Sequence, residues 1–463
     1  MTSIFSKEST VLIVVMVASF LTTFIGSSIN LALPSIGTQF QGGALLLSWI
    51  VTAYLLATAA FLLPFGRLAD MLGRRKVFLT GLALFSCSSF LSGMAWSVEV
   101  LFFFRIIQGM ASAMIFSTGM AILVSSYPAE KRGKVIGFNS AAVYIGLSLG
   151  PVLGGFLNYY FGWRSIFYFT TVLSVVAFGL TLLQFKEAKS KTQEETFDFA
   201  GSIGYMIAIV ATLYGFSDLA RAASAKYILG LGIFIMILFL YYETKQKQPL
   251  FPVSLFFENM QFAFSNLAAM VNYSATFAIG FLLSLHLQVV VQLDSQAAGL
   301  VLLAQPLVMA LFSPFAGALS DRRSPTVVAS IGMAISAIGL FCFSFITIES
   351  SLLWIIAVLA LVGFGFALFG PPNNNAIMGS VTKEFYGAAS SALAAMRLIG
   401  QAVSMAIVTL LLSDHSQSLR ADLAYKQQLI DDFHKAFLIF AVLCTLGIVA
   451  SVARGRKRTK EQS

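Results

Sequence analysis

Long, uninterrupted apolar runs follow one another along almost the whole of this chain. A helix needs about 20 apolar residues to cross the hydrocarbon core of a bilayer, and at that length the sequence predicts fourteen spanning helices. Because the runs are continuous rather than alternating, they do not fit a transmembrane β-barrel. The predicted fold is an all-α polytopic membrane protein, with 14 transmembrane helices near residues 10–32, 45–66, 77–95, 98–122, 136–158, 164–185, 199–217, 227–242, 261–288, 298–319, 327–346, 352–379, 386–412 and 435–453.

The composition agrees with this assignment. Of the 463 residues, 58% are hydrophobic and 11% are charged, whereas ordinary soluble proteins carry about 25% charged residues. So few charges cannot solvate a soluble fold of this length, and the apolar content excludes a disordered chain. The net charge is +9, yet the partner that this composition predicts is the lipid bilayer and not a nucleic acid.

The basic residues predict an orientation in the membrane. With the N-terminus inside, 21 of the 29 Lys and Arg residues fall in inner loops and tails and six fall outside, as the positive-inside rule requires. Two remain within spans, Arg105 and Arg397, and no Asp or Glu lies in the middle of a span. We therefore expect a multi-pass protein of the plasma membrane with both termini cytoplasmic.

A short motif occurs twice. GRLADMLGRRK at residues 66–76 joins spans 2 and 3, and GALSDRRSP at residues 317–325 joins spans 10 and 11. Both copies carry a glycine, a leucine and an aspartate at a constant offset of 251 residues: Gly66, Leu68 and Asp70, then Gly317, Leu319 and Asp321. Both lie between the second and third spans of a six-span block, and parallel six-span halves are a known transporter architecture.

The repeat predicts the organisation of the chain. We expect an N-terminal six-helix bundle at residues 1–198 and a C-terminal six-helix bundle with a basic cytoplasmic tail at residues 261–463. Between them, residues 199–260 hold an inserted helix pair and a linker. The stretch PLFPVSLFF within 243–262 is too short and too broken by proline to span, so we expect it to lie along the membrane surface.

The first copy of the repeat has the chemistry of a charge clamp. Asp70 sits at a tight turn beside Gly73, with Arg74 and Arg75 close behind. A carboxylate there can pair with these bases or face a helix N-terminus, and such a contact can hold one conformation and release in another. The alternative is plain positive-inside loop charge, but the full pattern of Gly66, the acid, the second glycine and the bases favours the clamp.

The second copy departs from the pattern. Asp321 and Arg322 are present, but Ser324 and Pro325 stand where the second glycine and first arginine would fall. We therefore expect the first loop to matter more for function than the second.

Glycines form a bare stripe on the fifth span. In GLSLGPVLGG, Gly146, Gly150 and Gly154 are spaced i, i+4 and i+8, with Gly155 beside them, and Pro151 adds a kink site. Such a stripe permits close helix contact, and generic packing is the alternative to a specific function.

Two arginines are predicted inside spans. A charged side chain at the bilayer centre costs about 2.5–3.5 kcal/mol on insertion scales, so Arg105 and Arg397 need partners or a wet cavity. Gln108 and Gln401 follow them at i+3 and i+4 and share their helix faces. Arg105 has two open interpretations, a functional charge or a buried arginine satisfied by carbonyl groups; for Arg397 we favour a place on the cavity wall.

Other polar and aromatic residues gather in spans 1, 2, 4, 5, 9, 10, 12 and 13. The candidates for the substrate cavity are Asn30, Tyr54, Gln108, Asn139, Asn272, Tyr273, Gln305, Asn373, Asn374, Arg397 and Gln401. His286 lies near the predicted outer end of span 9, where we expect a solvated or interfacial histidine, with a proton relay as the alternative. The three cysteines lie in apolar runs with unrelated spacings, so neither a disulfide framework, a metal site nor another cofactor is expected.

Taken together, these motifs resemble the major facilitator superfamily. GRLADMLGRRK is similar to its signature loop, RIIQG (residues 105–109) to its fourth-helix motif, and GLSLGPVLGG to the antiporter motif of its fifth helix. The fourteen spans, QPLFPVSLFF and GFGFALFGPPNNN (residues 363–375) resemble its fourteen-helix drug:proton antiporter group. The resemblance implies alternating access, a role for Arg105 in proton coupling, and an outer seam between the halves at the glycine motif. It also implies a cavity lined by the first, second, fourth and fifth helices of each half.

The resemblance implies proton-coupled efflux of amphipathic small molecules. In the family, many relatives that export lipophilic cations have an acid in the first span, where this chain has FIGSSINLALP without one. Two arginines and no central acid should repel cations, so we expect neutral, zwitterionic or anionic substrates. The alternatives are uptake of an organic anion or metabolite, and a non-transporting sensor or subunit with a transporter-like fold. An enzyme is not expected, because no nucleophile–base set, phosphate loop or metal cluster is present.

Overall fold

The computed structural model describes residues 7–40, 44–184, 197–219, 224–246, 249–251, 253–412 and 423–453. Within these ranges, fourteen helices are long and apolar enough to cross a membrane, which confirms the predicted number. The described residues contain no strand. Residues 185–196 and the basic C-terminal tail from residue 454 lie outside the described residues.

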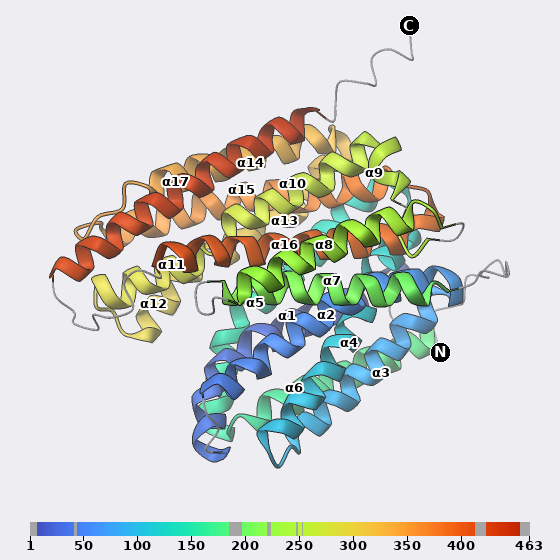
Figure 1. The fold of residues 1–463 in the computed structure, drawn as a ribbon, viewed down its shortest axis with the longest axis horizontal. Helices are drawn as coiled ribbons and strands as arrows, with labels where there is room; N and C mark the ends of the chain where they lie inside the picture. Colours follow the sequence, from blue (N-terminus) through green and yellow to red (C-terminus); the bar gives the residue numbers. More distant parts are fainter. Residues whose placement is uncertain are drawn as a thin grey trace, which may run out of the picture.

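The N-terminal half is a bundle of six helices, drawn in blue to teal in Figure 1. They are α1 (Lys7–Phe40), α2 (Ala44–Leu72), α3 (Arg74–Gly93), α4 (Val98–Ser126), α5 (Arg132–Phe161) and α6 (Arg164–Gln184). α1 packs along α5, α2 along α4, and α3 against α4 and α6. Short connections make this possible: Gly73 takes a φ of 102° between α2 and α3, a conformation that favours glycine.

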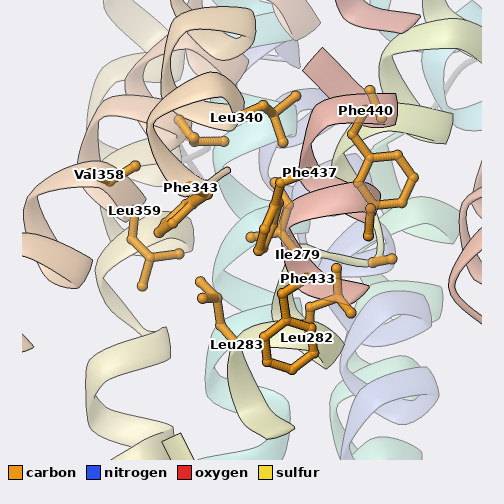
Figure 2. Close-up of a cluster of buried hydrophobic side chains, with 14 of the residues drawn as sticks. Ile279, Leu282, Leu283, Leu340, Phe343, Val358, Leu359, Phe433, Phe437 and Phe440 are labelled. Atoms are coloured by element: carbon orange, nitrogen blue, oxygen red, sulfur yellow. The ribbon is translucent and has the colours of Figure 1, made fainter. Parts of the chain in front are cut away.

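The C-terminal half follows the same plan but with two interrupted spans. Its helices are α10 (Met260–Thr276), α11 (Ile279–Leu285) with a π-helical turn (His286–Val290), α12 (Ser295–Leu302), α13 (Ala304–Arg322), α14 (Pro325–Phe343), α15 (Leu352–Gly379), α16 (Tyr386–Leu412) and α17 (Leu423–Ala453). Figure 2 shows the centre of its core, where Phe343, Phe433, Phe437 and Phe440 pack with Leu282 and other aliphatic side chains.

The ninth and tenth spans are not the continuous helices that their apolar runs predict. The ninth breaks between α10 and α11, where the Ala278 N–H donates to Ser404 Oγ of α16 at 3.0 Å. The tenth breaks at Leu303, between α12 and α13. Because the hydroxyl that supports the first break comes from a distant helix, no local sequence signal reveals it.

The inserted helices, α7 (Phe199–Asp218) and α8 (Ala225–Glu243), pack on each other, and α7 also packs on α2 and α16. The linker that follows does not simply lie along the membrane surface, as the sequence suggested. Leu250, Phe251 and Val253 are buried in an apolar cluster shared with both halves, while the short helix α9 (Ser254–Glu258) has no buried residue. These three apolar side chains contact the interior of the bundle, whereas their composition alone predicts contact with lipid.

The last helix also begins earlier than predicted. α17 starts at Leu423 rather than near residue 435. The helix extends on the N-terminal side of the apolar run and includes Asp431 and Asp432. Many large apolar side chains lie on the outside of the bundle, for example Leu183 and Leu353 at 83% and 77% exposure, as expected for helices that face lipid.

Candidate functional site

The two halves meet at one end of the molecule, which carries residues 66–76, 131–134 and 317–325 and is called the basic end below. α5 packs on α13 there, and α2 and α4 pack on α16. Figure 1 shows the basic end at the right, and toward the left the blue-to-teal helices diverge from the yellow-to-red ones. The contacts at the basic end are therefore the candidates for a clamp between the halves.

Asp70 bridges the halves. It stands on α2 and accepts hydrogen bonds from Arg74 Nε and Nη2 at 3.0 and 2.8 Å. It also accepts the backbone N–H groups of Gly387 and Ala388, at 3.3 and 3.2 Å, in the first turn of α16. A helix N-terminus carries partial positive charge and unpaired N–H groups, so an ionised Asp70 stabilises this contact from both sides.

Arg74 extends the same contact. Its Nη2 donates to the backbone oxygen of Lys383, just before α16. Its guanidinium also lies 5.5 Å from the ring centroid of Tyr386, and that of Arg132 on α5 lies 5.9 Å from the same ring. Tyr386 thus lies near two cations of the other half.

Asp321 makes the symmetrical contact. It lies on α13 and accepts the backbone N–H groups of Gly133 and Lys134, at 2.6 and 2.9 Å, at the start of α5. The sequence departs from the motif pattern after this aspartate, yet the carboxylate reaches a helix N-terminus just as Asp70 does. Arg322 is exposed, so in this copy the contact rests on the carboxylate and the helix without a basic bridge.

Glycines bring the helix backbones of the two halves together. A β-carbon on Gly137 of α5 would lie 2.8 Å from Pro314 Cα on α13. One on Gly66 would meet the Ser391 side chain, and one on Gly317 would meet the backbone of Gly133. Two of these positions, Gly66 and Gly317, are the glycines of the repeated motif. The motif therefore supplies both the charge and the space for the contact.

The remaining members of the first loop serve the N-terminal half. Gly73 has open space around it and provides the turn. Arg75 Nη2 donates to the backbone oxygen of Leu182 on α6 at 3.3 Å. The structure thus separates the bases that the sequence grouped together, because Arg74 faces the other half and Arg75 does not.

Replacing Asp70 or Asp321 by asparagine should slow transport. Hydrogen bonds to a charged group contribute about 1.5–3 kcal/mol, and tenfold in a ratio corresponds to about 1.4 kcal/mol, so each change should destabilise the closed basic end about tenfold or more. Asp70→Asn should have the larger effect because it also releases Arg74. Initial rates in proteoliposomes measure this, with Glu258→Gln on the exposed end of α9 as control. Wild-type turnover in both aspartate variants would remove the clamp.

Arg105 lies in the interior of the N-terminal half. Its side chain is fully buried, its Nε donates to the backbone oxygen of Ile50 at 3.0 Å and its Nη1 to Gln108 Oε1. The guanidinium stacks on the Tyr54 ring at 4.3 Å, and Gln108 continues to Ser89 Oγ at 2.7 Å. Arg105 Nη2 has no hydrogen-bond partner among the described residues, and no described carboxylate pairs with this cation.

Tyr54 does not line a cavity as the sequence suggested. It is 3% exposed, and its hydroxyl bonds to the Thr22 backbone oxygen and Ser112 Oγ, both at 2.8 Å. The Tyr54 ring is the platform for Arg105, which explains its burial. Gln108 is likewise fully buried and belongs to this network.

Aromatic side chains join the halves deeper in the bundle. Phe366 of α15 packs edge-to-face against Tyr144 of α5, with ring centroids 5.9 Å apart, and against Tyr273 of α10 at 5.4 Å. The guanidinium of Arg397 on α16 lies 5.2 Å from the Tyr273 ring. Arg397 is partly exposed, and its Nε has no hydrogen-bond partner among the described residues. This cluster combines an incompletely paired cation with three aromatic rings.

The glycine stripe of α5 faces its own half. A β-carbon on Gly146, Gly150 or Gly154 would meet Thr23, Ser27 or Ser28 of α1. The expectation of an outer seam between the halves is therefore wrong for this conformation. The stripe instead lets α1 approach so closely that Ser27 Oγ donates to the Gly146 backbone oxygen at 3.3 Å. Pro151 is exposed on α5, and Gly155 is partly buried.

The other cavity candidates are dispersed. Asn30 is exposed on α1, Gln305 and Gln401 are partly buried, and Asn139, Asn272, Asn373 and Asn374 are buried. Asn373 donates to the Ser265 backbone oxygen at 3.1 Å and so ties α15 to α10. The Asn272 amide atoms and Asn139 Oδ1 have no hydrogen-bond partner among the described residues, and a buried polar group without a partner is a candidate for ligand or water contact.

His286 is not the solvated residue that its place in the sequence suggested. It is fully buried, in the π-helical turn, with its ring 6.1 Å from that of Phe433. Neither ring nitrogen has a hydrogen-bond partner within the described part of the chain. The turn carries the side chain into the core of the C-terminal half.

Sequence reasoning missed Tyr144, Phe366 and Tyr386. Tyr144 and Phe366 stand on spans 5 and 12, which were already predicted to line the cavity, so aromatic residues on those spans were the available signal. Tyr386 directly precedes the glycine that binds Asp70, and only the pairing of the halves reveals its position.

Comparisons with known proteins agree with this geometry. The family model of the Major Facilitator Superfamily matches residues 15–267 and 265–463. The chain is 30% identical over 459 residues to the riboflavin transporter RibZ of Clostridioides difficile (strain 630), covering 98% of this chain and 99% of that protein. It is 30% identical over 385 residues to the multidrug resistance protein Stp of Mycobacterium tuberculosis (strain CDC 1551 / Oshkosh), covering 82% and 71%.

A solved structure shares the fold. The human organic anion transporter MFSD10 (TETRAN) superposes with a TM-score of 0.64 at 16% sequence identity, over 95% of this chain and 100% of that one. At this identity the likeness shows the architecture alone.

Proposed function

This chain belongs to the major facilitator superfamily and is a membrane transporter, not an enzyme, and we propose that it exports amphipathic small molecules in exchange for protons. In this proposal the chain comprises bundles at residues 1–198 and 261–463, with residues 199–260 as an accessory insertion. The basic end faces the cytoplasm of the cell that carries the protein in its plasma membrane, and both termini lie on that side.

The observation that carries the substrate class is the aromatic cluster around Arg397. A guanidinium 5.2 Å from the Tyr273 ring, in a cluster that Phe366 and Tyr144 extend, offers charge attraction to anions and ring stacking to planar compounds. No described acidic side chain forms an ion pair with it, so a monovalent cation would meet net repulsion. Neutral, zwitterionic and anionic substrates are therefore favoured over cations.

Alternating access supplies the mechanism. The basic end is closed by Asp70 and Asp321, each on the N-terminus of a helix in the other half. Release of both contacts would let the halves rock about the central aromatic cluster and expose it to the cytoplasm. Arg105 is the candidate for proton coupling, because its uncompensated charge lies on α4 against α2, which carries Asp70.

A second function has support from one observation. RibZ, which is similar over nearly the whole chain, is named a riboflavin transporter, and multidrug resistance is named for Stp. Uptake of a metabolite is thus the alternative to drug export. Flux direction in proteoliposomes separates the two: export requires that an imposed proton gradient drive substrate opposite to proton flow, and uptake with protons would contradict it. If no anionic, zwitterionic, neutral or cationic test compound is transported in either direction, the result would favour a non-transporting sensor.

Arg397→Gln should weaken binding of anionic substrates most. Loss of a charged hydrogen-bond donor costs about 1.5–3 kcal/mol, so KM for an anion should rise about tenfold or more, while KM for a neutral compound should change little. Lys226→Gln is the matched control, because the Lys226 ammonium also lies over a ring, that of Tyr227 at 5.1 Å, but on the inserted helix α8. Equal KM changes for anionic and neutral compounds would contradict this assignment, and strong ethidium efflux by the wild type would contradict the substrate class.

A further inference from the structure

The inserted helix pair holds two carboxyl groups that the transport mechanism does not use. Asp198 caps the N-terminus of α7, and Glu243 is the last residue of α8. Because α7 and α8 are antiparallel neighbours, these two ends lie together. Glu243 is only 2% exposed, so a charge there is poorly solvated.

Each carboxyl group has one satisfied oxygen. Asp198 Oδ1 accepts the Gly201 N–H at 2.8 Å and the Tyr242 hydroxyl at 3.3 Å. Glu243 Oε2 accepts the Phe251 N–H at 2.9 Å. The other two oxygens, Asp198 Oδ2 and Glu243 Oε1, have no hydrogen-bond partner among the described residues.

The two unsatisfied oxygens face the same point. A β-carbon on Gly201 would lie 2.5 Å from Glu243 Oε1 and would also collide with Asp198 Oδ2. Glycine at this position leaves the space between the oxygens open. Two ionised carboxylates placed this way repel each other, and a single proton between them would satisfy both.

We propose that Asp198 and Glu243 form a proton-binding site, in which one shared proton joins Asp198 Oδ2 to Glu243 Oε1. Among the described residues at this end of the helix pair, the other ionisable groups are Tyr242, which donates to Asp198, and Lys245, whose ammonium lies over the Tyr241 ring at 5.7 Å. α2 and α16 pack on α7, and their described residues place no charged side chain in ion-pair or hydrogen-bond contact with either carboxyl group. A shared proton would give both open oxygens, Asp198 Oδ2 and Glu243 Oε1, a hydrogen bond.

The proton-binding site controls the linker after α8. Glu243 holds Phe251 through its backbone N–H, and Phe251 belongs to an apolar cluster with Phe262 of α10, Met378 of α15 and Tyr386 of α16. The same cluster includes Leu62 and Leu63 of α2, so the linker packs where the two halves close. Proton binding favours the state in which the pair is assembled, and loss of the proton frees the linker from the closed basic end.

Proton binding by Asp198 and Glu243 is independent of the direction of transport and of the substrate. It concerns the accessory helices and predicts a pH-dependent contact in the resting protein. Its failure would leave the proposed transport function untouched.

Hydrogen–deuterium exchange of the full-length protein in nanodiscs tests it, with the Phe251 amide as reporter. After correction for intrinsic exchange, wild-type protection at Phe251 should be high at pH 5.5 and should fall by about tenfold or more by pH 8.5, because opening sets the exchange rate. Glu243→Gln should keep high protection at every pH, since the amide oxygen accepts the Phe251 N–H and the NH2 donates to Asp198. Glu258→Gln, on the exposed end of α9, should behave as wild type.

The outcomes are distinct. Protection that does not change with pH in the wild type, or that falls equally in Glu243→Gln, would overturn the proton site. Should Glu243→Gln fail to fold, Asp198→Asn replaces it, because asparagine still caps a helix and can donate to Glu243. Loss of wild-type protection on adding EDTA, restored by Mg²⁺, would show a metal ion between the carboxylates and would likewise overturn the proposal.

Discussion

Transport by the Gly137→Val variant is expected to fall by about tenfold to a hundredfold, because overpacking a tight contact costs about 1–3 kcal/mol and tenfold corresponds to about 1.4 kcal/mol. A β-carbon at this position meets the Ser313 backbone oxygen and lies 2.8 Å from Pro314 Cα. Backbone atoms of α13 cannot rotate away as a flexible side chain could. The variant should therefore be unable to close the basic end, although each half can still fold.

Two measurements separate a blocked cycle from a folding defect. Rates in proteoliposomes are compared with Gly179→Val on α6, where a β-carbon would have no atom within 4 Å. In a cysteine-free background, Ser390→Cys reports closure, because the Ser390 hydroxyl donates to the Phe116 backbone oxygen of the other half. Thiol labelling should be slow with Gly137 and fast with valine. If the Ser390→Cys thiol stays protected from labelling when Gly137→Val is also present, and this variant transports at the wild-type rate, then closure does not require the close contact between Gly137 and α13.

Most of the fold could be predicted from apolar length and charge. The fourteen spans follow from runs of about 20 residues, and a membrane removes most alternatives because every backbone group must be satisfied within the helix. The interruptions in the ninth and tenth spans could not be predicted, since one of them depends on Ser404 from α16. The buried linker escaped prediction for a related reason: Leu250 and Phe251 are as apolar as lipid-facing residues, and only assembly decides which surface they meet.

The candidate site could be predicted where the sequence repeats itself. Asp70 and Asp321 were found from the repeat, and the suggestion that Asp70 faces a helix N-terminus matches the geometry, whereas the helix itself, α16, could not be named. The altered sequence of the second copy did not reveal the contact that Asp321 makes. The partners of Asp321 are backbone N–H groups, which carry no sequence signature. Polar residues in spans were a weaker signal: Tyr54 and Gln108 are bound to Arg105 inside one half.

The glycine stripe of α5 also shows what the sequence can and cannot predict. The spacing of Gly146, Gly150 and Gly154 predicts that a helix approaches closely, and the structure has such an approach. Spacing does not identify the neighbour, which is α1 rather than the other half. By contrast Gly137, which belongs to no recognised motif, is the glycine that meets α13. A glycine stripe thus predicts a close helix contact. Only the tertiary arrangement shows whether that contact lies within one half or between the two halves that move during transport.

Arg105→Met should keep the N-terminal half folded and abolish proton-driven transport. An unpaired buried charge is costly to desolvate, and methionine removes that charge while keeping most of the side-chain volume. Arg105→Ala instead leaves a cavity, and large-to-small core changes cost about 2–5 kcal/mol. The methionine variant thus removes the charge without the cavity. If the charge of Arg105 couples protons to substrate, its loss should stop transport driven by a pH gradient but spare substrate exchange without a gradient.

Arg164→Met is the matched control for this experiment. Arg164 also stacks on an aromatic ring, that of Trp163 at 4.3 Å, and donates to the Ala95 backbone oxygen at 2.9 Å, but it lies at the far end of the N-terminal half. Thermal unfolding in detergent checks that both variants fold. Wild-type gradient-driven transport in Arg105→Met would make Arg105 a packing residue, held by Ile50, Gln108 and Tyr54. Loss of unfolding stability in Arg105→Met similar to that in Arg105→Ala would instead show that these bonds to the guanidinium hold the bundle together.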